Sequence, residues 1–141
     1  MSFGSPYSKT MEKLVKECTD NGIHIVVSAC NKLSDACIVS LAAAPSAITV
    51  ATSYKSDQIA DFSNYGSCVD IYAPESDNDS HVLKETSMSA PHVVGTVALY
   101  ISTYGSLHPS NMSEAIISLA TKNNITGIPD RNNTYFLRVS Y

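Results

Sequence analysis

Ser87 lies within a segment whose residue types could support nucleophilic catalysis, residues 85–92 with the sequence ETSMSAPH. The apolar residues that follow predict a helix over 87–103, which would place Ser87 at a helix N-terminus. Unpaired backbone N–H groups and the helix dipole favour negative charge there, as a reaction through an oxyanion requires. By position alone, the simpler role for this serine is a helix N-cap.

Asn31 is the second polar residue with a chemical use. It follows an apolar run over 23–29, which is typical of a parallel strand buried on both faces. Open α/β sheets bind ligands beyond the carboxyl ends of such strands. A side-chain amide there could donate a hydrogen bond to a developing oxyanion, whereas capping of the loop backbone is the alternative role.

The four histidines do not offer Ser87 an evident base. Five helical steps turn about 500°, so His92 would lie on a different side of the helix from Ser87, packed behind it as a structural residue. His24, within the apolar strand, is expected in the core or at the sheet edge. His81 and His108 fall in polar loops.

The elements that must position these residues alternate between helical and strand patterns, which predicts an α/β fold in one domain. An amphipathic helix is expected over 8–21 and a further helix over 111–122, where Asn111 and Glu114 have the spacing of a capping box variant. The helix over 87–103 is apolar nearly all round, so it is predicted to be buried at the centre. Further strands are expected over 47–51, 68–72 and 134–139.

Charge and composition exclude some classes of protein. The 141 residues carry a formal net charge of −4 with nine scattered basic residues, whereas a nucleic-acid surface needs clustered Lys and Arg. No apolar run approaches the roughly 20 residues that span a bilayer. The first residues lack the basic head and apolar core of a signal peptide. Neither a nucleic-acid partner nor a membrane span is expected.

Glycosylation sequons begin at Asn78, Asn111, Asn124 and Asn132. Sequons arise by chance, yet four in the second half of the chain favour a secreted or vacuolar parent protein whose signal lies upstream. The four cysteines show no Cys-x-x-Cys spacing, so a zinc site is not expected. Their even number permits two disulfides, but free buried thiols are the default expectation in a chain of this length.

Several segments resemble, in order and at suitable spacing, the subtilisin-like serine proteases and among these the proteinase K branch. They are residues 2–4 (SFG), 26–31 (VVSACN), 62–66 with 69–74 (FSNYG and VDIYAP) and 86–95 (TSMSAPHVVG). The likeness covers nearly the whole chain, and the last motif is highly specific. It implies a doubly wound, mostly parallel sheet with helices on both faces. This chain would be the C-terminal half of that domain, incomplete at the N-terminal side.

The resemblance also implies roles for individual residues. Ser87 would be the nucleophile and Asn31 the oxyanion donor, with no cofactor required for the chemistry. The substrate, an extended peptide or protein segment, would add to a strand edge in the manner of β-augmentation. The residues of that edge and of the adjoining specificity pocket would be Ser2, Phe3, Gly4, Ala29 and Cys30.

A structural calcium ion is a further implication of the resemblance. Its ligands would be the Asp70 carboxylate and the main-chain oxygens of Pro45 and Ala47. A lone carboxylate with carbonyl ligands and water suits this hard cation. A hydrogen bond at the end of a strand is the alternative role for Asp70.

The sequence departs from the family in ways that bear on activity. The triad of the family runs Asp, His, Ser along the chain, and no Asp-Thr-Gly or His-Gly-Thr-His stretch occurs here, so Ser87 would lack its base. Glu85, Cys30 and Ser5 stand where the family has glycine. A missing N-terminal half would bare a strand edge and the apolar face of the central helix. We therefore expect a partner fragment, self-association or a repacked fold.

The leading hypothesis is the C-terminal portion of a subtilisin-like serine endopeptidase, inactive as this chain alone. The alternative is a non-catalytic pseudoprotease that binds peptides or a partner protein through the old substrate edge, which Glu85 and Cys30 favour. A third hypothesis, a small secreted structural glycoprotein, is supported only by the sequons. A nucleotide-binding domain is disfavoured because no Gly-rich loop follows any predicted strand.

Overall fold

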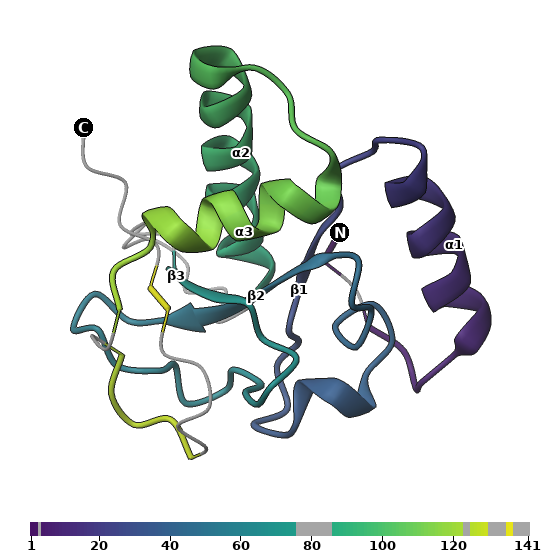
Figure 1. Ribbon diagram of the computed structural model, residues 1–141. Coiled ribbons are helices and arrows are strands. Elements are labelled where there is room, and N and C mark those ends of the chain that lie inside the picture. Colours follow the sequence, from purple (N-terminus) through teal and green to yellow (C-terminus); the bar gives the residue numbers. More distant parts are fainter. Residues whose placement is uncertain (3, 76–85, 123–124, 130–134, 137–141) are drawn as a thin grey trace.

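The chain forms an α/β fold around a parallel sheet (Figure 1). The computed structural model describes residues 1–2, 4–75, 86–122, 125–129 and 135–136. Within these residues the sheet has the strand order β1-β2-β3, with the bounds Val26–Ser28, Ile48–Ser53 and Ile71–Pro74. Val27 pairs with Thr49, and Ala51 pairs with Tyr72. Because these strands are parallel, their carboxyl ends meet at one edge of the sheet.

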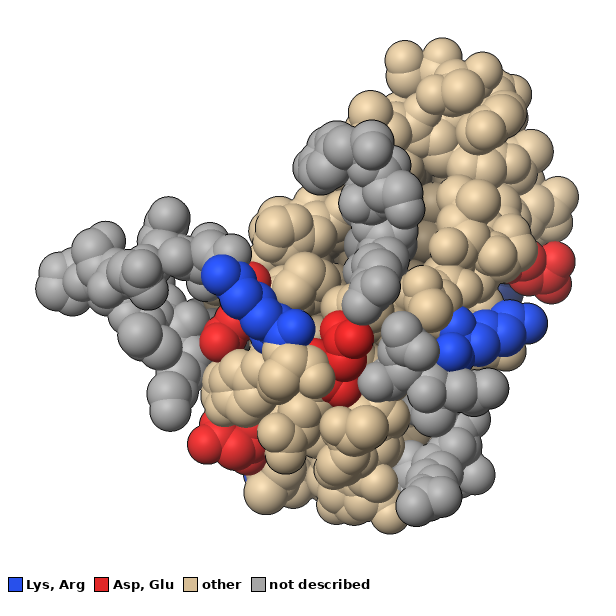
Figure 2. Space-filling view, turned by 90° about the vertical axis from the view of Figure 1, so that its left-hand side faces the viewer, with Lys and Arg blue, Asp and Glu red and all other residues tan. Residues whose placement is uncertain are grey.

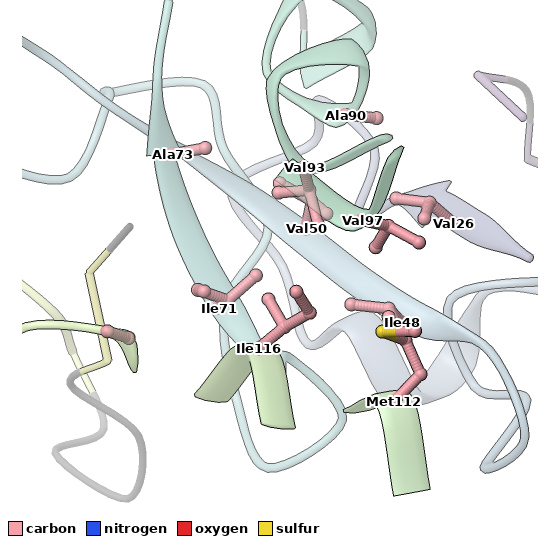
Figure 3. Packing of buried hydrophobic residues seen from close by; sticks show 11 residues of the cluster. Val26, Ile48, Val50, Ile71, Ala73, Ala90, Val93, Val97, Met112 and Ile116 are labelled. Atoms are coloured by element: carbon pink, nitrogen blue, oxygen red, sulfur yellow. The ribbon is translucent and has the colours of Figure 1, made fainter. Parts of the chain in front are cut away.

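Helices cover both faces of the sheet. On one face, α2 (Ala90–Tyr104) and α3 (Pro109–Leu119) close over a core that Figure 3 shows from nearby. The buried residues of this core include Val26, Ile48, Val50, Ile71, Val93, Val97, Met112 and Ile116. On the other face, α1 (Lys9–Asp20) contributes Val15 to a cluster with Val27 and Leu41. Two short 3-10 segments, η1 (Ala36–Ile38) and η2 (Thr86–Met88), complete the described helical elements.

Strand β2 lies at the centre of the sheet, and all six of its residues are buried. Ile48 and Val50 pack against α2 and α3, whereas Ala51 packs with Tyr72 on the opposite face. Burial on both faces explains the continuous apolar runs in the sequence. The three predicted inner strands are confirmed, although β1 is shorter than 23–29 and β3 begins three residues later than predicted.

The helix predicted over 8–21 is confirmed as α1. Ser8 is its N-cap, where the hydroxyl accepts a hydrogen bond of 3.5 Å from the Met11 N–H, and Gly22 follows its end with φ of 82°. The capping box predicted for α3 is wrong. His108 is the N-cap residue there, its Nδ1 accepts from the Ser110 N–H at 3.5 Å, and Pro109 occupies the first turn. Proline suits that position because its missing N–H needs no partner.

The burial predicted for the central helix is wrong in this chain. Ala90, Val93 and Val97 are buried, but Val94 is 49% exposed and Leu99 is 56% exposed. The fifteen residues of α2 include no charged side chain, and the upper part of the surface in Figure 2 is correspondingly uncharged. A helix that is apolar all round is normally buried, so the outer face of α2 lacks the cover that its sequence is suited to.

The remaining predictions have mixed outcomes. Of the strand predicted over 134–139, only residues 135 and 136 are described, and Phe136 forms bridges with Tyr72 and Thr121. Cys37 and Cys68 form a disulfide, so the expectation of free thiols is wrong for this pair, while Cys18 and Cys30 are free. In the described part of the chain, no helix is long and apolar enough to cross a membrane.

Candidate active site

Asn31 and the turn that carries Ser87 lie together at the carboxyl edge of the sheet. Asn31 follows β1 by three residues, and its Oδ1 accepts a hydrogen bond of 2.7 Å from the Thr86 N–H, 55 residues further along the chain. With Oδ1 engaged by Thr86, the amide nitrogen of Asn31 is the atom that can donate elsewhere. The structure therefore brings Asn31 next to the residue that precedes Ser87.

Ser87 is the middle residue of η2 and is half-buried. Helix α2 begins three residues later at Ala90, so Ser87 lies in the turn ahead of the helix and not at its first residue. The N-cap is Ser89, which makes no side-chain cap hydrogen bond. The capping role considered for Ser87 thus belongs by position to Ser89.

Ser89 is fully buried and ties this turn to the sheet. Its Oγ donates to the Pro74 carbonyl at the end of β3 (3.1 Å) and lies 2.8 Å from Thr52 Oγ1 of β2. The Thr52 N–H in turn donates to Ser63 Oγ at 3.0 Å. Hydrogen bonds in such a dry site are strong, and a missing partner is costly. This network, which the sequence analysis did not identify, holds the turn against the ends of two strands.

The residues predicted for the substrate edge differ in exposure. Ser2 and Gly4 are exposed, Ala29 is buried, and Phe3 lies outside the described residues. The Met1 carbonyl accepts a hydrogen bond of 3.0 Å from the Ser28 N–H, so the first residue pairs with the outer edge of β1. The segment that begins at Met1 is therefore held beside the strand that leads to Asn31.

Cys30 departs from what this position requires. Its φ is 75°, in the left-handed region that favours glycine. Its thiol fills the space that a Cβ on Gly4 would take, and burial raises the pKa of that thiol above its ordinary value. Ser5 is not among the described residues with positive φ, so its own departure from glycine carries no such strain. Glu85 lies outside the described residues.

The described histidines occupy three different settings. His92 is exposed on α2, so its predicted packing behind the helix is wrong. His24 is half-buried before β1, and neither ring nitrogen has a hydrogen-bond partner among the described residues. His108 caps α3, and His81 lies outside the described residues.

Asp70, the candidate calcium ligand, is largely buried just before β3. Its Oδ2 accepts a hydrogen bond of 2.7 Å from the Thr49 N–H, and its own N–H donates to the Thr49 carbonyl at 2.9 Å. Burial raises the pKa of the carboxyl from 3.8 to about 6, against the opposing effect of the Thr49 hydrogen bond. The salt bridges of the described residues lie on α1, between Lys13 and Glu17 and between Lys16 and Asp20. Asp70 has the strand-end hydrogen bonds of its alternative role.

The remaining described candidates, Asn111, Pro45 and Ala47, lie apart from the carboxyl edge of the sheet. Asn111 is exposed on α3, and the other sequon asparagines, 78, 124 and 132, lie outside the described residues. Among the described residues, no three His, Cys, Asp or Glu side chains gather as a metal site would require. An open groove of about 840 Å³ runs between α1 and α3, and Pro45 and Ala47 are part of its lining.

Comparison with known proteins places these features in context. The model of the subtilase family matches residues 1–135. Over 92% of its length, the chain is 39% identical to the subtilisin-like serine protease Pen ch 18 of Penicillium rubens. It is 38% identical over the same share to the subtilisin-like serine protease pepC of Aspergillus niger. The chain spans 30% and 28% of these curated relatives, so it corresponds to less than a third of each.

A solved structure shares the fold. The crystal structure of a cold adapted subtilisin-like serine proteinase superposes with a TM-score of 0.88 at 32% identity. The match covers 96% of this chain and 52% of that one. The fold that the resemblance implied, a parallel sheet with helices on both faces, is confirmed, and it corresponds to about half of the solved chain.

The buried Asp70 carboxyl predicts that stability depends on pH. The folded protein holds this proton up to about pH 6, while an unfolded chain releases it near pH 4. The free energy of unfolding therefore falls as the pH rises between these values and levels off above them. In buffer containing a chelator, we expect the wild type to lose about 3 kcal/mol relative to Asp70→Asn between about pH 4 and pH 7, as measured by urea unfolding.

The matched control for this experiment is Glu114→Gln, since Glu114 is an exposed carboxylate on α3. Its unfolding free energy should follow the pH curve of the wild type. Parallel curves for the wild type and Asp70→Asn would contradict the prediction, because they would show that Asp70 titrates alike in the folded and unfolded states.

Proposed function

The chain belongs to the subtilase family, and we propose that it is the C-terminal portion of a subtilisin-like serine endopeptidase, inactive as this chain alone. The reaction is hydrolysis of a peptide bond in a peptide or protein substrate, with Ser87 as the nucleophile. The observation that carries the proposal is the hydrogen bond from the Thr86 N–H to Asn31 Oδ1. It holds an amide donor beside the turn of a serine nucleophile.

The chemistry assigned to this chain is attack and charge stabilisation. Ser87 Oγ adds to the substrate carbonyl carbon, and the hydroxyl proton passes to an imidazole base. The carbonyl oxygen becomes negative and accepts a hydrogen bond from the Asn31 amide. Collapse expels the amine with that proton and leaves an acyl-enzyme, which water hydrolyses. Loss of the oxyanion donor in a subtilisin, the established example, costs about 100- to 1000-fold in rate. Asn31 would therefore contribute strongly to the rate of the reaction.

The base would come from the other half of the domain. No Asp-Thr-Gly or His-Gly-Thr-His stretch occurs in this sequence, and the chain matches 52% of the solved relative. The uncharged, half-exposed outer face of α2 offers an apolar surface for that half. The segment that begins at Met1, which already pairs with Ser28 of β1, would be the adjoining strand edge. Docking of an N-terminal half would cover both features, and self-association is the competing outcome.

A structural calcium ion is part of the proposal. The Asp70 carboxylate is buried, and the carbonyls of Pro45 and Ala47 come just before β2, whose Thr49 contacts Asp70. A buried carboxylate with carbonyl oxygens suits calcium, and the ion would offset the cost of a desolvated charge. Its role would be to stabilise the loop before β2, at a distance from the reaction.

The secretory pathway is the proposed compartment. The Cys37–Cys68 disulfide is typical of proteins in an oxidising compartment, and the sequon at Asn111 is exposed. The intact mass of protein from its natural source tests this, because an unglycosylated, reduced chain would oppose it. We propose no membrane or nucleic-acid partner.

A pseudoprotease that binds peptides without cleaving them is the second candidate. The observation that favours it is Cys30, whose thiol lies against Gly4 where substrate backbone would need room. The two functions share the same edge and differ in whether the reaction can proceed there.

Labelling by a fluorophosphonate tests the leading proposal. We expect no adduct on the chain alone, because Ser87 lacks a base. A fusion to the N-terminal half of the peptidase domain of the Penicillium rubens relative should gain an adduct at Ser87, read by peptide mass spectrometry. Ser87→Ala should lose the adduct, and Ser118→Ala, an exposed serine on α3, should keep it. A folded fusion without an adduct would remove the claim of catalytic competence.

Cys30→Gly should raise the catalytic efficiency of the same fusion. Glycine accepts the positive φ without the roughly 1–2 kcal/mol that another residue incurs, and it clears the thiol from Gly4. We expect kcat/KM for a peptide substrate to rise by about tenfold, mainly through KM. Leu33→Gly is the matched control, because Leu33 also has positive φ (46°) but is exposed. No gain, even with Glu85→Gly added, would favour the pseudoprotease, whereas an equal gain in both variants would show that the thiol beside Gly4 is not the obstacle.

Calcium should stabilise the chain through Asp70. At 100 times its dissociation constant, a bound ion adds about 2.7 kcal/mol to the free energy of unfolding. We expect the thermal midpoint of the wild type and of Glu114→Gln to rise with added calcium at neutral pH, and that of Asp70→Asn to stay constant. A rise of equal size in Asp70→Asn would place any bound calcium elsewhere.

A further inference from the structure

Asn64 is a wholly buried polar residue in the loop between β2 and β3. Its Oδ1 accepts hydrogen bonds from the Lys32 N–H (2.9 Å), the Ser34 N–H (3.2 Å) and Ser34 Oγ (3.3 Å). Its own N–H donates to the Cys30 carbonyl at 2.9 Å. These contacts lie on both sides of Asn31, the residue that meets Thr86.

The contacts of this side chain fix its orientation. Backbone N–H groups can only donate, so the atom that accepts from both Lys32 and Ser34 must be the amide oxygen. The Nδ2 atom is buried and has no hydrogen-bond partner among the described residues. The side chain therefore acts through one oxygen that several donors share.

The loop that Asn64 contacts has an unfavourable backbone path. Cys30 and Leu33 both have positive φ, at 75° and 46°, and such conformations persist only where surrounding contacts hold them. The Leu33 N–H donates to the Phe62 carbonyl (3.1 Å), and the Tyr65 N–H donates to the Ser34 carbonyl (3.1 Å). Those bonds secure the far side of the loop, whereas the bonds of Asn64 reach both sides of Asn31.

We propose that Asn64 is a positioning residue for the oxyanion donor. Its side chain clamps Lys32 and Ser34 while its main-chain N–H holds the Cys30 carbonyl, and together these contacts set the turn from which the Asn31 side chain reaches the Thr86 N–H and the reacting carbonyl. This inference rests on the proposed peptidase function for its catalytic meaning, but its structural content concerns only the Asn31–Thr86 contact. Asn64 touches neither the substrate nor the reacting atoms.

The first test measures the Asn31–Thr86 contact without any need for activity. Amide hydrogen exchange at Thr86 is followed in the full chain for the wild type, Asn64→Leu and Asn64→Asp. Leucine has a similar size but no acceptor, so the Thr86 amide should exchange at least tenfold faster than in the wild type. Aspartate keeps an acceptor oxygen in the same place, so it should restore exchange to near the wild-type rate.

The matched control is Thr49→Val, which removes a buried hydrogen bond of 3.0 Å to the Ala42 carbonyl, away from the Asn31 loop. Urea brings all variants to the same global stability before exchange is compared. Equal Thr86 exchange in Asn64→Leu and Thr49→Val would overturn the proposal, as would failure of Asn64→Asp to restore it. If Asn64→Leu does not fold, Asn64→Ser, whose hydroxyl is too short to span Lys32 and Ser34, takes its place with the same expectations.

The second test reads the catalytic consequence in the fusion that carries the N-terminal half. Asn64→Leu should lower kcat for a peptide substrate by about tenfold with KM unchanged, because an oxyanion donor acts mainly in the transition state. Asn64→Asp should recover most of that loss. A rise in KM with kcat unchanged in Asn64→Leu would oppose the proposal. The two tests separate the hypotheses. A wild-type fusion that never hydrolyses peptide, with Thr86 exchange still controlled by Asn64, overturns the peptidase function and leaves the positioning role intact.

Discussion

The hydrogen bond from the Thr86 N–H to Asn31 Oδ1 is the contact on which the candidate site depends. It spans 55 residues and exists only because the sheet is parallel and its strands end at a common edge. Asn31 reaches that edge from β1, and Thr86 reaches it from η2, just ahead of α2. Packing of Val93 and Val97 against Val26 then holds α2 over the same sheet. Apolar burial thus stabilises the fold, and the hydrogen bond between Thr86 and Asn31 aligns the Asn31 amide with the turn that carries Ser87.

A second constraint is the buried polar network behind the serine turn. Thr52, Ser63 and Ser89 are fully buried, where a hydroxyl without a partner would be destabilising. Their mutual hydrogen bonds satisfy one another and link β2, the loop before β3 and the N-cap of α2. Asn64, next to Ser63, extends this connection to the loop that carries Asn31. The reactive turn and the amide donor are therefore positioned by neighbouring parts of the same polar interior.

The sequence predicted the helices and strands that local patterns determine. It did not predict contacts between residues that are far apart in the chain. Helix α1 followed from apolar spacing, and the buried strands followed from continuous β-branched runs. The Asn111 capping box failed because Pro109 and His108 provide an earlier start to α3. The Cys37–Cys68 pair joins residues 31 apart in the sequence, and no local pattern encodes that distance. The apolar character of α2 indicated a buried environment, but Val94 and Leu99 on its outer face are exposed in this chain.

Cys30 shows how a scaffold and an activity can diverge. The backbone turn at residue 30 is the step that carries the chain from β1 to Asn31, and its positive φ is the conformation that glycine adopts without strain. A cysteine there keeps the turn, because Asn64 holds the Cys30 carbonyl, yet it adds a side chain against Gly4 on the substrate edge. The positive φ of Cys30 lowers the stability of the fold, whereas its thiol would obstruct a peptide bound along that edge. The Asn31–Thr86 geometry is therefore compatible with either cleavage or simple binding, and the two proposed functions differ in the room that they require beside Gly4.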